Sequence, residues 1–300
     1  MNKSAICLTL ALFLFGLGVA QTSTVVATTV VDDLGQELEI TNPPQRIVSL
    51  APSVTELLFA VGAGPQLVAV SEHSDHPPQA SALPRVANAL GIDYERIVDF
   101  EPDLVIAWLT GNGHRAIKRL EQLGLRVFVT EPRRFSDIER LLSLLGRLSG
   151  HPKEGSSQAL EFTRRAALLR DTFSGKPRVS VFYQISERPL MTLNGEHMVS
   201  ELFTLCGGEN VFHNYRSLAP TISIEDVLQR DADIILISST VPNVNSVRDW
   251  WLKMTDLKAA QRGQVFIVDA DLINRQGPRI IQGAEQICTH IDKARYKSAG

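Results

Sequence analysis

The sequence predicts an α/β protein with two Rossmann-like lobes, each with a central, mainly parallel sheet, joined by one long α-helix, with a ligand cleft between the lobes. Three observations lead to this prediction. Short apolar runs alternate with helical patterns, which is typical of parallel strands covered by helices. This alternation occurs twice in the same order, and a long amphipathic segment separates the two copies. At about 150 residues per domain, the 300 residues of the chain suffice for two lobes.

The composition is that of an ordinary globular protein. Hydrophobic residues make up 44% and charged residues 21% of the chain, which excludes a disordered chain, a collagen and a protein with many membrane spans. The formal net charge of −3 gives no basic excess of the kind that nucleic-acid binding requires. We therefore expect no nucleic-acid partner.

Residues 1–20 are predicted to be a secretory signal peptide. Lys3 precedes an apolar run from Ala5 to Val19, and the small residues Gly18 and Ala20 fit a cleavage site before Gln21. The run is shorter than the about 20 residues that a membrane-spanning helix needs, which argues against a membrane anchor. We expect cleavage after Ala20 and export of the mature chain.

Residues 21–44 form a predicted N-terminal extension, in which alternating polar and apolar residues around Asp33-Leu34-Gly35 indicate a hairpin. Residues 45–150 form the first predicted lobe. Its helices include two that are expected to begin at capping boxes, Ser53-x-x-Glu56 and Ser136-x-x-Glu139. Its buried strands are expected at residues 47–50, 67–70, 104–107 and 127–129.

Residues 151–176 are predicted to form the helix that bridges the lobes. Apolar residues recur there at every third or fourth position, at Ala159, Phe162, Ala166, Leu169 and Phe173. A helix is stiffer than a Gly/Ser-rich linker, so we expect the lobes to move little relative to each other. Residues 177–300 form the second predicted lobe, with strands at 179–183, 234–237 and 265–268.

The two lobes are predicted to be related copies. Segments 95–107 and 225–237 both run from a glutamate through a helical turn to an aspartate and an apolar run, with the same spacing. Any joint between a helix and a strand could look alike, but two further pairs of segments match in the same order, 55–59 with 200–203 and 124–129 with 263–268. Two such lobes leave a cleft between them, where ligands bind.

Two cysteines remain once the predicted signal peptide, with Cys7, has been removed. In an oxidising compartment a lone pair of cysteines is usually bonded, which favours a disulfide between Cys206 and Cys288. Two buried free thiols are the alternative.

The sequence carries no motif of a common enzyme class. It lacks GxSxG, a P-loop, HExxH and a GxGxxG after a strand, so we expect no catalysis. The stretch from His73 to His76 resembles part of a metal site, but zinc needs three or four ligands and nothing in the sequence brings His114 near. We interpret it as a polar loop and predict no metal site.

Three side chains indicate a ligand site. Trp108 follows a predicted strand, at the end where open α/β sheets bind ligands; a core tryptophan is the alternative. Asp271 and Arg275 follow the strand at 265–268, where they could orient a polar ligand or form a local ion pair. Trp250 and Trp251 lie in a helical stretch and are predicted to pack in the core.

A family resemblance covers residues 45–295. The chain contains, in this order, RIVSLAPSVTELLF (46–59), SDHPP (74–78), ERI (95–97), PDLVIAW (102–108), CGGENV (206–211) and GPRII (277–281). Together they resemble the periplasmic substrate-binding proteins of vitamin B12 (cobalamin) ABC importers, the BtuF type. That group belongs to the helical-backbone metal-receptor class, which also carries siderophores and haem.

The resemblance implies a protein of the periplasm that binds cobalamin or a related corrinoid as its transported ligand and delivers it to an ABC transporter permease and ATPase complex. A ferric siderophore or haem binding protein of an iron importer is the alternative. The resemblance implies no cofactor and a monomer when free. It also implies a disulfide, because Cys206 and Cys288 match a cysteine pair of the B12 proteins.

The resemblance assigns roles to individual residues. Glu95 and Glu225 match two glutamates that dock onto arginines of the permease; ordinary exposed acids at helix starts are the alternative. Trp108, Asp271 and Arg275 match residues that line the ligand cleft. His73 stands where a tyrosine is typical and is a candidate ligand to cobalt or iron. Ala89 and Ala219 stand near positions usually held by tryptophan, so stacking contacts are missing there.

Overall fold

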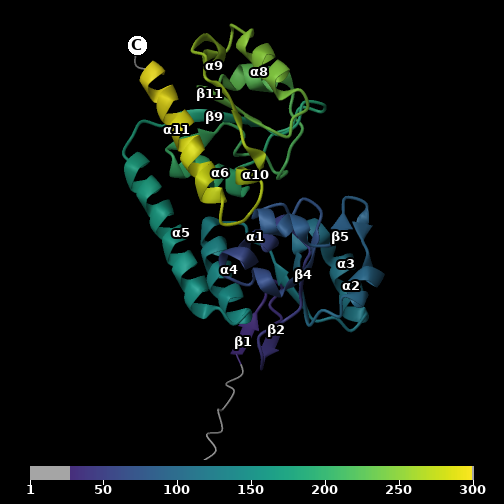
Figure 1. Cartoon of the computed structure of the whole chain (residues 1–300). Coiled ribbons are helices and arrows are strands. Elements are labelled where there is room, and N and C mark those ends of the chain that lie inside the picture. Colours follow the sequence, from purple (N-terminus) through teal and green to yellow (C-terminus); the bar gives the residue numbers. More distant parts are fainter. Residues whose placement is uncertain (1–27, 299–300) are drawn as a thin grey trace, which may run out of the picture.

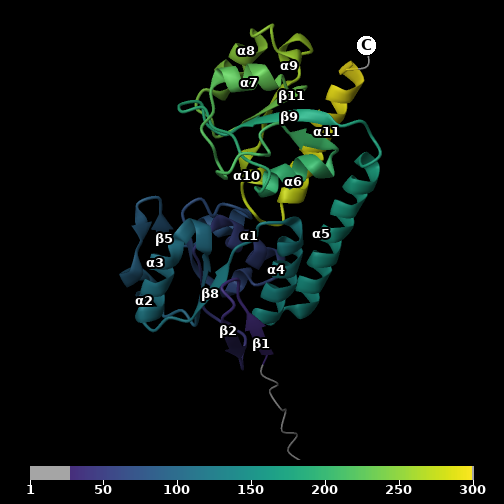
Figure 2. The same ribbon diagram turned by 180° about the vertical axis from the view of Figure 1, so that it is seen from behind.

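The computed structural model describes residues 28–298 of the chain. Two α/β lobes lie one above the other, and α5 (Pro152–Phe173) runs along one side of both (Figures 1 and 2). The predicted α/β class with two lobes on mainly parallel sheets is confirmed. The predicted signal peptide and residues 21–27 lie outside the described residues.

The first lobe is built on a six-stranded sheet with the order β6-β5-β4-β3-β7-β8. Neighbouring strands are parallel, except for β5 and β6, which are antiparallel. The strands are β3 (Ile47–Ser49), β4 (Leu67–Ser71), β5 (Arg85–Asn88), β6 (Gly91–Ile92), β7 (Leu104–Trp108) and β8 (Val127–Thr130). The helices are α1 (Pro52–Ala60), α2 (Tyr94–Asp99), α3 (Leu109–Gln122) and α4 (Phe135–Leu148), with short 3₁₀ turns at Gly64–Gln66 and Pro78–Ala82.

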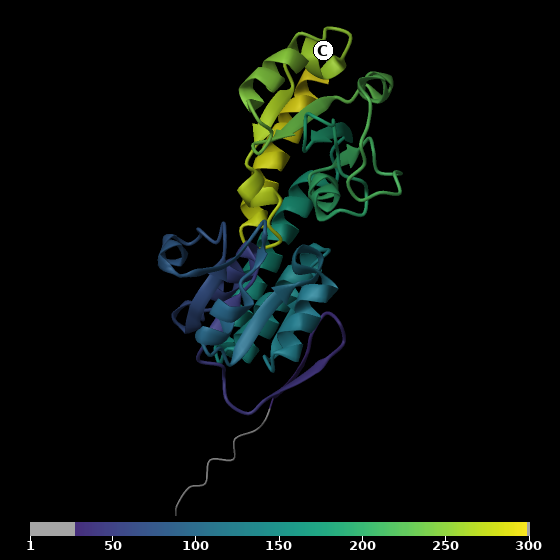
Figure 3. The same ribbon diagram turned by 90° about the vertical axis from the view of Figure 1, so that its right-hand side faces the viewer.

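The predicted hairpin consists of β1 (Thr28–Val31) and β2 (Glu37–Ile40), which pair in antiparallel fashion below the first lobe (Figure 3). Two aspartates in its turn attach it to β8 and to α4. The backbone N–H of Val129 donates to Asp32 Oδ2 at 3.2 Å, and Arg140 on α4 forms an ion pair with Asp33 at 2.6 Å.

The second lobe is built on a four-stranded, parallel sheet with the order β10-β9-β11-β12. Its strands are β9 (Val179–Gln184), β10 (Gly208–Asn210), β11 (Ile234–Ser238) and β12 (Val265–Val268). Its helices are α6 (Met198–Leu205), α7 (Ile224–Arg230), α8 (Val244–Leu252), α9 (Lys258–Gln261), α10 (Ala270–Ile273) and α11 (Ile280–Ser298).

One apolar core extends through both lobes and the bridging helix. It contains buried side chains from α4, α5, α6 and α11, such as Leu142, Phe162, Leu202 and Ile287. Helices α4 and α5 pack so closely that a Cβ on Gly146 would lie 2.7 Å from the Cα of Gly155. A shared core resists separation of the lobes, which supports the expectation that they move little.

The two predicted capping boxes are wrong. Helix α1 begins at Pro52 after Ala51, which makes no side-chain cap, and α4 begins at Phe135 after Arg134. Proline at the first helical position has no N–H that needs a partner. Glu56 instead contacts arginines of the other lobe. At α4, the Asp137 carboxylate accepts the N–H of Arg134 at 2.9 Å.

Among residues 28–298, no helix combines the length and the apolar character that crossing a membrane would require.

Candidate functional site

The carboxyl ends of the strands in the two sheets face each other. Asp75 follows β4 of the first lobe and Arg275 follows β12 of the second, and Arg275 Nη1 lies 2.8 Å from Asp75 Oδ1. Ligands of parallel α/β sheets bind beyond the carboxyl ends of the strands. The region around this ion pair is therefore the candidate ligand site.

The first lobe has a cavity of about 430 Å³ at these strand ends, and Trp108 lines it. Trp108 is the last residue of β7 and is half-buried. The side chain of Asn112 fixes the turn that follows: its oxygen accepts the Trp108 N–H at 2.8 Å, and its amide donates to the Leu50 carbonyl at 3.1 Å. The chain thus presents the indole to the cavity from a rigid support.

The Trp108 ring packs against Gly111, where a side chain would collide with it. A Cβ at Gly111 would lie 2.2 Å from Trp108 Cε3, far inside the contact distance of two carbon atoms. Any larger residue there would displace the indole.

His73 lines the same cavity and is exposed. Its φ of 62° lies in the left-handed region, which non-glycine residues rarely occupy. The next residue, Ser74, is buried and holds the loop, because its Oγ accepts from Thr55 Oγ1 at 3.1 Å and its carbonyl accepts from Arg85 Nη2 at 3.0 Å. The polar loop is therefore a supported turn that presents an imidazole. Within residues 28–298, no three His, Cys, Asp or Glu side chains form a group that could hold a metal ion.

Asp271 and Arg275 form the local ion pair that the sequence offers as one of two possibilities, at 2.9 Å. Arg275 also contacts Glu56 at 3.2 Å and Asp75 at 2.8 Å, both on the first lobe. Arg279 donates two hydrogen bonds to Glu56, at 2.7 and 2.9 Å. No pattern in the sequence marks Glu56 or Arg279 as part of the site. A buried acid at a helix start gives no sign of a partner more than 200 positions away.

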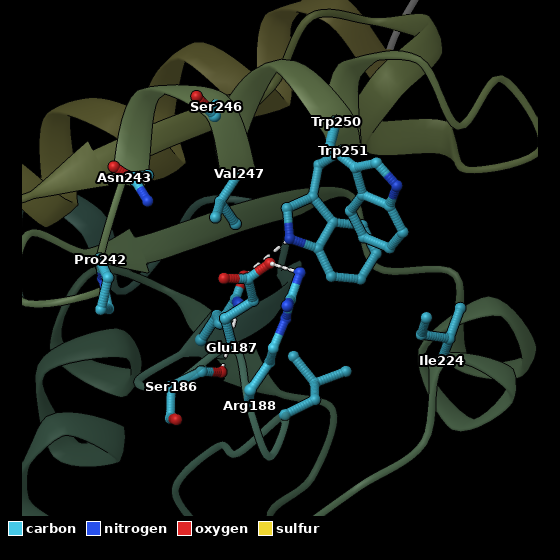
Figure 4. A pocket seen from close by; sticks show the side chains of 12 residues that line it. Ser186, Glu187, Arg188, Ile224, Pro242, Asn243, Ser246, Val247, Trp250 and Trp251 are labelled. Atoms are coloured by element: carbon cyan, nitrogen blue, oxygen red, sulfur yellow. Dashed lines mark hydrogen bonds and ion pairs between the residues drawn. The ribbon is translucent and has the colours of Figure 1, made fainter.

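The second lobe has a cavity of about 830 Å³ between the loop after β9 and helix α8 (Figure 4). Trp251 packs as predicted: it is fully buried, and its Nε1 donates to Gln184 Oε1 at 2.7 Å. Trp250 differs from the prediction, because it is 43% exposed and lines the cavity together with Ile224 and Arg188. The spacing of two adjacent tryptophans does not reveal which one faces solvent.

Glu95 and Glu225 occupy matching positions in the two lobes. Each is exposed and is the second residue of a short helix, α2 or α7. The aspartates that follow them also match: Asp103 accepts the N–H of Arg46 ahead of β3, and Asp233 accepts the N–H of Ser180 in β9, both at 3.0 Å. Neither glutamate forms an ion pair with another residue of the described part of the chain.

Ala89 and Ala219, which stand near positions where the family resemblance implies a tryptophan, differ in solvent exposure. Ala89 is exposed and lines the cavity of the first lobe, whereas Ala219 is half-buried. Each is next to an exposed leucine, Leu90 or Leu218, and Leu90 lines the same cavity as Trp108. Aliphatic side chains thus stand beside both positions.

The predicted disulfide is confirmed. Cys206 at the end of α6 is bonded to Cys288 in α11, and both residues are buried. The guanidinium of Arg295 in α11 donates to the Cys206 carbonyl and to the Pro177 carbonyl, which holds the same corner of the lobe.

Comparison with known proteins gives a consistent result. A family model described as "Periplasmic binding protein" matches residues 47–272. The chain is 39% identical to a vitamin B12-binding protein of Vibrio cholerae over 84% of this chain and 91% of that protein. It is 36% identical to a vitamin B12-binding protein of Photorhabdus laumondii over 83% of this chain and 88% of that protein.

Solved structures of periplasmic binding proteins have the same fold. The crystal structure of the periplasmic vitamin B12 binding protein BtuF of Vibrio cholerae has a TM-score of 0.78, with coverage of 84% of this chain and 98% of that one. A periplasmic haem binding protein from Pseudomonas aeruginosa has a TM-score of 0.73, with coverage of 83% and 92%. Its sequence identity is 23%, so it supports the fold alone.

Proposed function

The chain belongs to the periplasmic binding protein family, and from this premise we propose that it captures cobalamin or a related corrinoid between its lobes and delivers it to the permease of an ABC importer. The protein acts by binding and release, without catalysis, and is a monomer when free. It is exported to the periplasm after cleavage behind Ala20.

One observation carries the proposal. Trp108 lines a cavity at the strand ends of one lobe, and Arg275, paired with Asp271 at the strand ends of the other lobe, contacts Asp75 of the first. A corrinoid offers both kinds of partner, since it has a large planar macrocycle and a rim of amide side chains. The indole supplies an apolar face for the ring, and the carboxylate and guanidinium supply an acceptor and donors for the amides.

The absence of aromatic rings at Ala89 and Ala219 lowers the affinity that we expect for the ligand. The absence of an aromatic ring at Ala89 or Ala219 weakens the binding free energy by about 1–3 kcal/mol at each position. Leu90 and Leu218 stand beside these positions and are exposed. They supply part of the apolar surface that a ring would give, without the geometry of a stacked ring.

Haem is the second candidate ligand, because His73 presents an imidazole in the cavity that Trp108 lines. Neutral imidazole is a common ligand to iron and cobalt. If His73 coordinates the metal of a bound corrinoid or haem, the visible spectrum of that ligand changes on binding, and His73→Ala removes the change.

The experiment is a calorimetric titration of the mature chain, residues 21–300, with cyanocobalamin, haemin and ferrichrome in parallel. We expect one-to-one binding of cyanocobalamin below micromolar concentration and no comparable binding of the other two. Tight binding of haemin or ferrichrome, with no binding of cyanocobalamin, would assign the protein to iron uptake and refute the corrinoid proposal.

Glu95 and Glu225 are proposed to dock the loaded protein onto the permease. Their matching, exposed positions on two related lobes suit a partner with two-fold symmetry. Replacing both by alanine should abolish corrinoid uptake by cells that depend on this protein, with ligand affinity unchanged. Glu121→Ala with Glu196→Ala, an exposed glutamate in each lobe, is the matched control. Undiminished uptake by the Glu95/Glu225 variant would remove the docking role.

A further inference from the structure

A buried carboxylate joins the two lobes directly behind the proposed ligand site. Glu56 lies on α1 of the first lobe, and only 1% of its side chain is exposed. Its partners come from the second lobe: Arg279 binds both carboxylate oxygens, at 2.7 and 2.9 Å, and Arg275 Nη1 lies 3.2 Å from Oε1. The chain between α10 and α11 descends to α1 to make these contacts (Figure 1).

Arg275 contacts three carboxylates that differ sharply in exposure. Its Nη1 contacts Glu56 and Asp75, and its Nη2 contacts Asp271. The Arg275 side chain is only 13% exposed, whereas those of Asp75 and Asp271 are 54% and 55% exposed. One partner of the guanidinium is therefore inaccessible to water and the other two are open to it.

We propose that Glu56 positions Arg275 for the ligand, and that Asp75 holds the same guanidinium only until a ligand oxygen replaces it. This inference rests on the proposed function, in which Arg275 contacts the ligand. It adds two residues with opposite roles, one that fixes Arg275 and one that competes with the ligand for it.

The opposite roles follow from burial. Breaking the contact between Glu56 and the arginines would leave a charge unpaired inside the protein, which is strongly unfavourable. The contact with Asp75 is at the surface, where water replaces a departing partner at little cost. When a ligand arrives, Arg275 therefore keeps Glu56 and exchanges Asp75 for an amide or phosphate oxygen.

The charge state of Asp75 suits this role. The Arg275 guanidinium, through its hydrogen bond, holds the pKa of the Asp75 carboxyl below its usual value. Asp75 is thus ionised at neutral pH and occupies Arg275 in the unliganded protein. Arg279 does not compete for Asp75, because its guanidinium donates both of its hydrogen bonds to Glu56.

The test compares ligand affinity, by titration of the mature protein with cyanocobalamin, between Asp75→Asn and Glu56→Gln. Asp75→Asn should bind about two- to fivefold more tightly, the range expected for loss of an exposed competing ion pair. Glu56→Gln should bind about tenfold or more weakly, because Arg275 loses its fixed partner. A purely structural role for both carboxylates would lower affinity in both variants or change neither.

Two controls separate this effect from folding and from net charge. Glu121→Gln removes one exposed negative charge from the first lobe at a residue that does not line the Trp108 cavity, and it should leave affinity unchanged. Asp75→Asn should also have no effect in a protein that already carries Arg275→Ala, because the competition needs the guanidinium. This second control keeps the test valid even where Glu56→Gln fails to fold.

The outcomes are distinguishable. A wild-type protein that binds none of cyanocobalamin, haemin and ferrichrome refutes the proposed function, and this inference with it. Cyanocobalamin binding by the wild type, with affinity unchanged or lowered in Asp75→Asn, leaves the function intact and overturns the exchange at Arg275. An equal gain in affinity in Glu121→Gln overturns it as well.

Discussion

Reduction of the disulfide gives the most direct test of how the second lobe is held together. The bond joins Cys206 to Cys288 and closes a loop of 82 residues. In the chain-entropy model, a loop of this length stabilises the fold by about 4.5 kcal/mol at 25 °C, because it restricts the unfolded chain. Total stabilities are about 5–15 kcal/mol, so this is a large share.

The assay is urea unfolding of the mature protein, followed by circular dichroism, after refolding with and without a phosphine reductant. This comparison changes no side-chain volume, since both thiols remain in place. Because one apolar core spans both lobes, we expect a single cooperative transition. The urea midpoint of the reduced protein should be lower, and in a parallel thermal melt its melting temperature should be lower by about 10 °C or more.

The control is the Cys206→Ala, Cys288→Ala double variant, on which the reductant should have no effect. Thiol titration of the unfolded, unreduced protein should find no free thiol. Coincident urea midpoints for the oxidised and reduced wild type would refute the loop-entropy argument at this site.

Three further predictions concern single residues. Trp108→Ala should weaken corrinoid binding by about 1–3 kcal/mol, or roughly 5- to 150-fold by calorimetry, because it removes a large apolar surface from the site. Gly111→Ala should also weaken it and alter tryptophan fluorescence, since the new methyl displaces the Trp108 ring, whereas Gly175→Ala, with open space around it, should do neither. Burial lowers the pKa of His197 to about 4, so its neutral Nδ1 accepts the Val199 N–H at 3.2 Å. The unfolded chain takes up a proton below about pH 6.5, so stability should fall by about 3 kcal/mol as pH decreases from 6.5 to 4. His197→Asn, which retains an acceptor but does not titrate there, should flatten this slope in urea unfolding; an unchanged slope would contradict the assignment.

The sequence predicts most strands because strands buried on both faces are continuous apolar runs. Strands β3, β4, β7, β8, β9, β11 and β12 lie where such runs occur. The sequence does not predict β5, β6 and β10, since Arg85–Asn88, Gly91–Ile92 and Gly208–Asn210 carry too few apolar side chains. They lie at or next to the sheet edges, where pairing with a neighbour rather than apolar sequence makes a strand.

The site is predictable only where a local pattern carries the information. The place of Trp108 beside a cavity is predictable because it ends a buried strand, and strand ends are where parallel sheets bind ligands. The role of Glu56 is not, because Ser53-x-x-Glu56 matches a capping box while the true partners lie in the other lobe. Long-range ion pairs leave no periodicity in the sequence, so they emerge only from the folded chain.

The predicted internal repeat pairs Glu56 with a second glutamate that also contacts the other lobe. The matching segments 55–59 and 200–203 place Glu56 on α1 and Glu201 on α6, the first helix of each lobe to follow its first sheet strand. Glu201 also reaches across the lobes: its carboxylate accepts the backbone N–H of Phe135, at the start of α4, at 3.0 Å. Each lobe thus contributes a glutamate that contacts the segment following the last strand of the other lobe.

Glu56 and Glu201 differ in the groups that they contact on the opposite lobe. Glu201 accepts a backbone N–H at the N-terminus of α4, where the helix carries a partial positive charge. Glu56 binds Arg279 and Arg275, and Arg275 continues past it to Asp75 and Asp271. Both glutamates therefore join the lobes, but only Glu56 supports a guanidinium at the proposed ligand site. This asymmetry is the physical reason that replacing Glu56 should affect ligand affinity, whereas replacing Glu201 should affect stability alone.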